Sequence, residues 1–214
     1  MLRMSAAGDC ERNLWAGLND IPEDKEIEPR ILALFDHGNA IEVHVIRLLR
    51  LSGRNVIDVD PGTNDQFELV DFDGKEVGHI DGKIETGSRP TNRHLSLLEI
   101  KSANTKQFNM LLELGYVAWK PTYASQIQKY MGNADLPDAL VIVYCKDDSR
   151  IHAERILYDP VAFFNLRGKA HRIIESTELL NRPPEAKSQY CKFCKYCNRN
   201  QWCWAPTTGA NFDD

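Results

Sequence analysis

GHIDGKIE (residues 78–85) and LLEIKSA (residues 97–103) are the two stretches on which the fold of this chain depends. Their patterns of apolar and polar residues predict two β-strands. Because successive side chains of a strand point to opposite faces, Glu99 and Lys101 lie on one face, and the apolar neighbours of Glu99 point into a core. Asp81 is expected near the middle of the first strand.

The carboxylates of Asp81 and Glu99 converge if the two strands are neighbours. Such oxygen ligands suit a hard divalent cation, Mg²⁺ or Mn²⁺. A lysine beside that ion can orient or deprotonate a water, or stabilise charge on a phosphate. The alternative is a set of ordinary surface charges. An acid inside an apolar run is costly to bury without a partner, which favours the metal site.

The 214-residue chain is long enough for a domain with a full core, and 43% of its residues are hydrophobic. It contains no apolar run of membrane-spanning length and no apolar stretch at its start, so we expect a cytoplasmic protein that enters no membrane. The net charge is −5, so any nucleic-acid binding must depend on local patches. We expect one domain over residues 1–204 and a disordered tail over residues 205–214.

Hydrophobic periodicity and turn residues predict a mixed α/β fold with a mostly antiparallel sheet. The expected helices cover residues 6–18, 29–51, 104–116, 122–133 and 160–180. The expected strands cover residues 54–59, 66–72, 76–86, 94–101, 138–145 and 151–158. The sequence FDGK predicts a hairpin turn between the second and third strands. Gly38 is a candidate break in the second helix.

The order of these motifs resembles that of a known enzyme family. HID and EIK, followed by Gln126 and Tyr130 in a Q-x-x-x-Y pattern, are similar to the PD-(D/E)XK nuclease superfamily. More narrowly, the chain resembles the RecB-like nucleases, which include CRISPR-associated RecB-like exonucleases and lambda-type phage exonucleases. The resemblance extends from Cys10 to Cys203. It implies a restriction-endonuclease-like fold, in which helices flank a central mixed β-sheet.

The resemblance also implies roles for individual residues. Asp81 and Glu99, together with the carbonyl of Ile100, would hold the metal ion. Lys101 would be the catalytic lysine.

Gln126 and Tyr130 are four residues apart and share one helix face. In the family this pair lies beside the active site and contacts the substrate or the catalytic network. The alternative is that both are ordinary positions of an amphipathic helix.

The family places a further acid or histidine on the preceding helix, four residues after a glycine. Here that position is Glu42, which follows Gly38. Glu42 shares a helix face with Val45 and other apolar residues, where a carboxylate needs a cation or hydrogen bonds. We expect Glu42 to be the third ligand, directly or through water. His44 is the second candidate, and its alternative is an ordinary surface or core histidine.

Four of the six cysteines crowd the segment CKFCKYCNRNQWC (residues 191–203). In a reducing compartment such a cluster indicates a metal site rather than disulfides. The segment resembles that of the iron–sulfur subgroup of these nucleases, in which one N-terminal and three C-terminal cysteines hold a four-iron, four-sulfur cluster. On this resemblance the ligands are Cys10, Cys194, Cys197 and Cys203. The alternative is a local Zn²⁺ site that uses Cys191 in place of Cys10.

Either metal would be structural and would join the cysteine-rich tail, residues 187–204, to the start of the domain. Basic and aromatic residues alternate along this tail. Cations that follow phosphates and rings that stack on bases suit single-stranded nucleic acid. The alternative, which we favour for most of the rings, is that they pack around the metal. These residues are Lys187, Lys192, Lys195 and Arg199, with Tyr190, Phe193, Tyr196, Trp202 and Trp204.

We therefore expect a Mg²⁺- or Mn²⁺-dependent DNA exonuclease that hydrolyses phosphodiester bonds. The resemblance implies a role in phage recombination and DNA processing, or in CRISPR-associated DNA trimming. The expected partners are DNA, as single strands or duplex ends, a recombinase or CRISPR integration partner, and further copies of the chain. The rival hypothesis is a catalytically inactive nucleic-acid-binding module with a structural iron–sulfur or zinc site.

Overall fold

Two β-sheets organise the chain in the computed structural model, which describes residues 1–87 and 90–205. Within those residues, β2–β5–β6–β7–β8 form a five-stranded main sheet and β1–β4–β3 form a three-stranded small sheet. The strands are Leu2–Arg3 (β1), Val56–Ile57 (β2), Glu68–Asp71 (β3), Glu76–His79 (β4), Gly82–Thr86 (β5), His94–Ala103 (β6), Asp138–Cys145 (β7) and Ile151–Leu157 (β8). β6 pairs in parallel with β7 and antiparallel with β5, so the main sheet is mixed.

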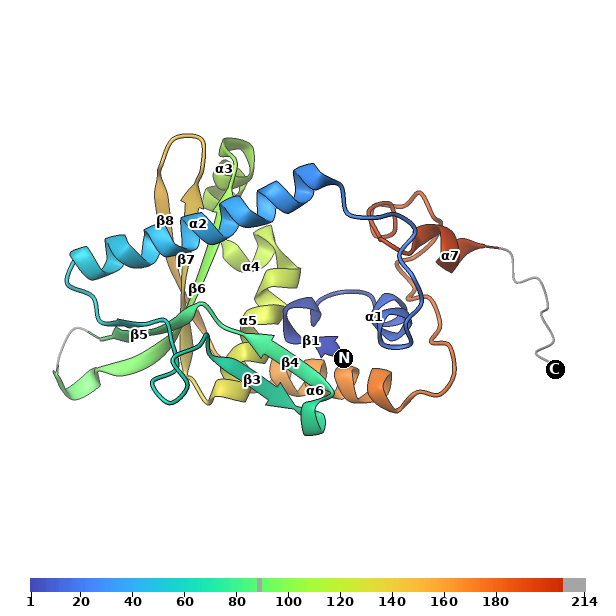
Figure 1. Ribbon diagram of the computed structural model, residues 1–214, viewed down its shortest axis with the longest axis horizontal. Coiled ribbons are helices and arrows are strands. Elements are labelled where there is room, and N and C mark those ends of the chain that lie inside the picture. The colour runs from blue at the N-terminus through green and yellow to red at the C-terminus, as the bar shows by residue number, and fades with distance from the viewer. Residues whose placement is uncertain (88–89, 206–214) are drawn as a thin grey trace.

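Helices cover both faces of the main sheet (Figure 1). They are Glu11–Leu18 (α1), Pro29–Leu51 (α2), Thr105–Leu114 (α3), Tyr116–Trp119 (α4), Pro121–Ala134 (α5), Pro160–Glu175 (α6) and Asn200–Trp204 (α7). α2 packs on one face, while α3 and α5 pack on the other and α6 lies against α5. This arrangement confirms the predicted α/β class. None of the helices in the described ranges has the length and apolar character needed to cross a bilayer.

The two faces of β6 belong to different cores, as the alternation of its side chains predicts. Leu98 packs with Val45 of α2, whereas Leu97 packs with Ile127 of α5. Glu99 therefore lies on the α5 side of the sheet, inside an otherwise apolar layer. β6 is the strand that brings a buried carboxylate into the middle of the molecule.

The single strand predicted over residues 76–86 is wrong, because the chain changes sheets there. β4 ends at His79 in the small sheet, and β5 begins at Gly82 in the main sheet. Gly82 has a φ of +151°, and a Cβ at this position would lie 2.7 Å from the carbonyl oxygen of Ile57. Only glycine fits this close approach. Asp81 consequently lies in the break between the strands rather than in the middle of one.

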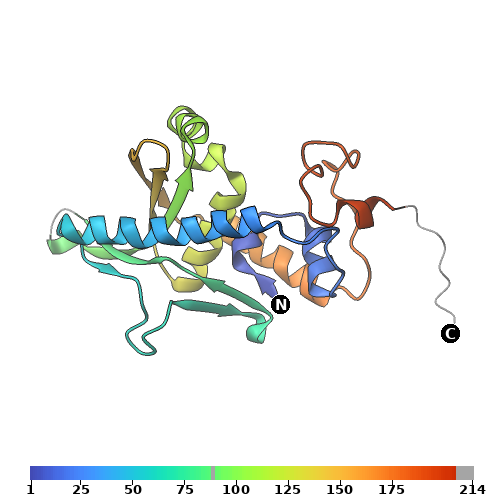
Figure 2. The ribbon, with the colours of Figure 1, turned by 45° about the horizontal axis from the view of Figure 1, so that its top comes forward.

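Other predicted boundaries also differ from those of the structure. α2 is continuous through Gly38, so the predicted break is wrong. The first ten residues of α2 are almost entirely exposed, because this end of the helix extends away from the sheet toward the tail (Figure 2). Gly115, with a φ of +74°, divides the helix predicted over residues 104–116 into α3 and α4. α6 ends at Glu175 rather than at residue 180. Of the predicted disordered tail, residues 206–214 lie outside the described residues.

A buried ion-pair network fastens α5 to the small sheet. Lys129 of α5 is fully buried, and its Nζ lies 2.8 Å from Glu76 Oε2 and 3.4 Å from Asp71 Oδ2. Arg167 of α6 also donates to both oxygens of Asp71. Removing one member of such a buried set leaves an uncompensated charge, which is costly. The network therefore fixes the position of α5, the helix that carries Gln126.

Gly132 of α5 gives a test of this packing. A Cβ added there would lie 2.2 Å from Cδ2 of Phe163, on α6, so Gly132→Ala should force the two helices apart. We expect the free energy of unfolding, measured with urea, to fall by about 1–3 kcal/mol. The matched control is Gly38→Ala, whose Cβ would meet no described atom within 4 Å. That change should raise the free energy of unfolding by roughly 0.5–1 kcal/mol. Equal effects of the two variants would contradict the packing described.

Candidate active site

Glu99 and Lys101 form an ion pair on one face of β6. Lys101 Nζ contacts Glu99 Oε1, and the same oxygen accepts a hydrogen bond of 3.0 Å from Gln126 Nε2 of α5. Glu99 is fully buried, while the Lys101 side chain keeps 22% of its surface exposed. Both Lys101 and Gln126 therefore contact the buried carboxylate of Glu99, and Lys101 is partly exposed to solvent.

Asp81 joins this pair from the break between β4 and β5. Its Oδ2 accepts a hydrogen bond of 2.7 Å from the backbone N–H of Ile100, the residue between Glu99 and Lys101. Burial raises the pKa of Asp81 well above its ordinary value, and the charge of Glu99 raises it further. Because Asp81 lies in the break between two strands, its carboxylate can contact the backbone of β6.

Glu42 approaches the same group from α2. Burial raises the pKa of Glu42, and the nearby negative charges of Glu99 and Asp58 add to the rise, although Lys101 opposes it. Glu42 in turn raises the pKa of Asp81. The raised pKa values of Glu42 and Asp81 are an effect that a divalent cation bound beside them would relieve.

The donors present fit a hard divalent cation. Glu99 Oε2 is buried and has no hydrogen-bond partner among the described residues, so one carboxylate oxygen is left for another ligand. In the part of the chain that the structure describes, no three His, Cys, Asp or Glu side chains already form a finished metal cage. Binding would therefore require the carboxylates to move closer together.

Lys101 is held in its charged form. Burial by itself would lower the pKa of Lys101, but the charges of Glu99 and Asp81 outweigh it and raise the pKa above its ordinary value. The Lys101 ammonium also lies 5.3 Å from the centroid of the Tyr123 ring. Such an ammonium can donate hydrogen bonds to a water or a phosphate oxygen.

The remaining sequence candidates differ in their positions. Tyr130 lies in the core close to Glu99, where burial raises the pKa of its hydroxyl to about 12. His44 is exposed, and its ring packs edge-on against Tyr144 with the centroids 5.8 Å apart. The structure thus places Glu42, and not His44, beside the carboxylates of Asp81 and Glu99.

Sequence analysis missed three residues near this group. Asp58 follows β2, and its charge raises the pKa of Glu42. Asp58 also forms an ion pair with Arg50 at 2.6 Å. Tyr123 lies next to Lys101, and the hydroxyl of Tyr116 is buried near Glu99 with no hydrogen-bond partner in the described chain. No motif marks any of them, because each reaches the site only through the packing of α4, α5 and the segment after β2.

An open groove leads away from Glu42 along α2. It has a volume of about 450 Å³, and its lining includes Asn39, Glu42, Arg47 and Arg50. Asp58 also lines the groove and pairs with Arg50, so Arg47 is the arginine that can contact a polyanion there while a cation neutralises the acids. The groove is therefore a suitable approach for a phosphate-bearing substrate.

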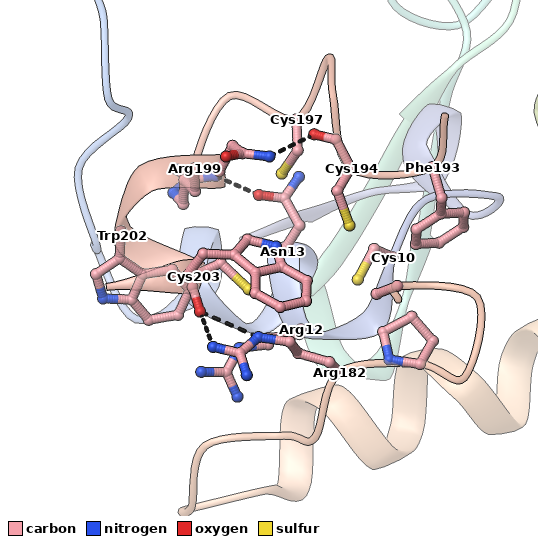
Figure 3. Close-up of a pocket in the computed structure, with 14 residues that line it drawn as sticks. Cys10, Arg12, Asn13, Arg182, Phe193, Cys194, Cys197, Arg199, Trp202 and Cys203 are labelled. Atoms are coloured by element: carbon pink, nitrogen blue, oxygen red, sulfur yellow. Dashed lines mark hydrogen bonds between the residues drawn. The ribbon is translucent and has the colours of Figure 1, made fainter. Parts of the chain in front are cut away.

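The C-terminal tail lies against the start of the chain, as predicted (Figure 3). Cys10, which precedes α1, and three tail cysteines line one pocket and point their sulfur atoms into it. Those three are Cys194, Cys197 and Cys203. Arg199 adds to the contact, since its Nε donates to the carbonyl of Ile21 at 2.7 Å.

Cys191 is not part of this cysteine pocket. Its Sγ instead lies 3.6 Å from the carbonyl oxygen of Glu185. The lining of the pocket thus contains the four cysteines of the iron–sulfur expectation, while Cys191 lies just beside them, hydrogen-bonded through its thiol to Cys194. Thiolates are suitable donors for either metal.

Three features describe how a metal centre would fit there. Burial and a hydrogen bond with the Cys191 thiol raise the pKa of the Cys194 thiol to about 11, and the neighbouring Trp204 partly offsets the rise. Trp204 Nε1 is buried without a hydrogen-bond acceptor among the described residues, so an N–H is available to a sulfur ligand. The pocket volume is about 30 Å³, and in the described residues no three of these cysteines are yet placed to hold an ion together. A four-iron cluster would need the lining side chains to move outward.

The tail rings divide into two groups. Phe193, Trp202 and Trp204 line the cysteine pocket. Tyr190 and Tyr196 lie outside it and are 79% and 84% exposed. Packing around the cysteine pocket thus accounts for three of the five rings and leaves the two tyrosines unexplained.

Solved structures show a similar arrangement of elements. The crystal structure of an alkaline exonuclease (LHK-Exo) from Laribacter hongkongensis has a TM-score of 0.56 and 19% sequence identity, over 81% of this chain and 86% of that one. LHK-Exo in complex with dAMP gives 0.54 and 19%, over 81% and 85%. The crystal structure of SSO0001 gives 0.53 and 14%, over 95% and 85%. No family model and no curated protein sequence matches the chain. These likenesses confirm the restriction-endonuclease-like fold.

Proposed function

We propose that this chain is a nuclease of the PD-(D/E)XK superfamily, a DNA exonuclease that depends on Mg²⁺ or Mn²⁺. The observation that carries the proposal is the convergence of Glu42, Asp81 and Glu99 on Lys101, with one oxygen of Glu99 left unpartnered. The fold supports it, because LHK-Exo is an exonuclease and one structure of LHK-Exo contains the deoxynucleotide dAMP.

The residues have separate tasks in this proposal. Glu42, Asp81 and Glu99, with the carbonyl of Ile100, would hold the divalent cation, which when bound lowers the pKa of a water and polarises a phosphate. Lys101 donates hydrogen bonds to the attacking water or to the phosphate oxygens. Gln126 holds the carboxylate of Glu99 in place.

Hydrolysis then proceeds by in-line displacement. The water oxygen loses a proton to solvent and forms a bond to phosphorus, the bond from phosphorus to the 3′ oxygen breaks, and that oxygen takes a proton from solvent. The product carries a 5′-phosphate. Along the groove beside Glu42, Arg47 can contact the phosphates that flank the scissile one.

The cysteine pocket would carry a separate structural centre. We propose that Cys10, Cys194, Cys197 and Cys203 hold an iron–sulfur cluster, with Zn²⁺ as the alternative, and that this centre joins the tail to α1. The biological setting would be phage recombination and DNA processing, or CRISPR-associated trimming, with a recombinase or an integration complex as partner.

The test is degradation of linear DNA by the purified full chain. We expect acid-soluble nucleotides to appear with Mn²⁺ or Mg²⁺ and to be absent when a chelator is added. A covalently closed circle of the same DNA should resist, since an exonuclease needs an end. Intact linear DNA with either metal would contradict the proposal and favour the inactive binding module.

A further inference from the structure

Tyr196 lies between two open hollows on the surface of the tail. The first hollow has a volume of about 470 Å³ and is lined on its other sides by Thr122 of α5 and Phe193. The second has a volume of about 320 Å³, and its lining includes Lys195. Tyr196 lines both. Each volume falls in the range of roughly 300–1,000 Å³ that is usual for sites that bind small organic groups.

The exposed groups in these hollows are of two kinds. Tyr196 is 84% exposed and Phe193 46% exposed, so both rings present a face to solvent. The Lys195 ammonium lies 5.4 Å from the centroid of the Tyr196 ring. Exposed rings accept the flat faces of unpaired bases, and neighbouring cations accept the phosphates between them.

Each hollow is also lined by one acid. Asp24 accepts hydrogen bonds from the backbone N–H groups of Gln201 and Trp202, at 2.7 and 3.2 Å. Asp9 lines the first hollow, and burial raises the pKa of its carboxyl, although Lys169 opposes the rise. Lys25 and Lys195 line the second hollow together with Asp24, so cations outnumber acids there.

α5 contributes residues to both the first hollow and the candidate active site. Thr122 precedes Gln126 by one helical turn, which is a rise of about 6 Å. Gln126 contacts Glu99, and Tyr123, the neighbour of Thr122, lies beside Lys101. A strand whose phosphate reaches Lys101 can therefore continue past Thr122 to Tyr196.

We propose that the two hollows around Tyr196 form a subsite for single-stranded DNA, in which unpaired bases stack on Tyr196 and Phe193 and Lys195 accompanies the backbone. A duplex cannot use the subsite in this way, because its bases are already stacked on one another. The inference rests on the proposed function, since it extends the path of the same substrate beyond the carboxylates.

Binding without cleavage tests the subsite directly. The probe is a fluorescently labelled oligothymidylate, and its anisotropy is measured with the full chain in the absence of divalent ions. Loss of one stacked base should weaken binding of the single strand by roughly 5- to 150-fold in Tyr196→Ala. Tyr196→Phe should bind within about twofold of the wild type, because the ring is retained.

Tyr190→Ala is the matched control. Tyr190 is a similarly exposed tyrosine of the same tail that lines neither hollow. The proposal is overturned if Tyr196→Ala and Tyr190→Ala bind the oligothymidylate equally, or if Tyr196→Ala weakens binding of a blunt duplex as much as that of the single strand. The outcome is separate from the proposed function: a chain that never cuts DNA can still show the Tyr196 effect, and an active nuclease can lack it.

Discussion

Glu99→Gln is expected to reduce metal-dependent DNA hydrolysis by on the order of 10²–10³-fold. The substitution keeps the shape of the side chain but removes its negative charge. That charge would bind the cation, and it pairs with Lys101 and accepts a hydrogen bond from Gln126. Lys101→Ala should cause a loss of similar size, because it removes the ammonium beside the scissile phosphate. Initial rates of nucleotide release with saturating Mn²⁺ measure both effects.

Lys106→Ala is the control for removal of a lysine. Lys106 is exposed on α3, a few residues beyond β6, so its loss should leave the rate within about twofold. Thermal unfolding of each variant separates a lost charge from a lost fold, because Glu99 is buried. Variants that are folded and cut DNA as fast as the wild type would remove Glu99 and Lys101 from the mechanism.

Cys10→Ser is expected to eliminate the metal centre of the tail, whereas Cys191→Ser should retain it. The two cysteines distinguish the alternatives, since Cys10 lines the cysteine pocket and Cys191 does not. Structural metal sites contribute about 10 kcal/mol or more of binding free energy, so losing one ligand should lower the unfolding temperature strongly. Metal content per chain and the visible absorbance of anaerobically purified protein are the measurements.

The identity of the metal follows from the same samples. A brown wild type with iron and sulfide supports the cluster, and a colourless wild type with one zinc per chain supports the zinc alternative. If Cys191→Ser loses the metal and Cys10→Ser keeps it, the ligands are the four tail cysteines and the proposed set is wrong.

The carboxylates were predictable because their chemistry conflicts with their surroundings. Glu99 stands in an apolar run, and the alternation of β6 places it on a buried face with Lys101 whatever the rest of the fold does. Glu42 was singled out by the family resemblance, which places an acid or histidine four residues after a glycine, and its position on the apolar face of α2 agreed with that role. For Glu99 and Lys101, local periodicity and the cost of burying a charge were sufficient.

The parts that sequence analysis missed depend on tertiary contacts. The change of sheet at Asp81 was hidden, because residues 76–86 suit either one strand or two, and the close approach of Ile57 to Gly82 is not visible in the sequence. The continuity of α2 shows the reverse case: a glycine costs a helix only about 1 kcal/mol, which α2 tolerates at Gly38. The positions of Tyr116 and Asp58 near the candidate site depend on how their segments pack in three dimensions, so sequence analysis did not predict them.

The cysteine pocket has a consequence for the order of events during synthesis. Arg199 Nη1 and Asn13 Oδ1 meet in its wall at 3.3 Å, although they are 186 residues apart in the chain. At about 5–20 residues per second, the ribosome needs roughly 10–40 s to make that length. Cys10 therefore emerges long before its three partners, while the main sheet between them is still being made. Completion of the pocket is therefore a late step, and until then Cys10 is a thiol without its neighbours in the pocket, accessible to oxidants and to metal ions.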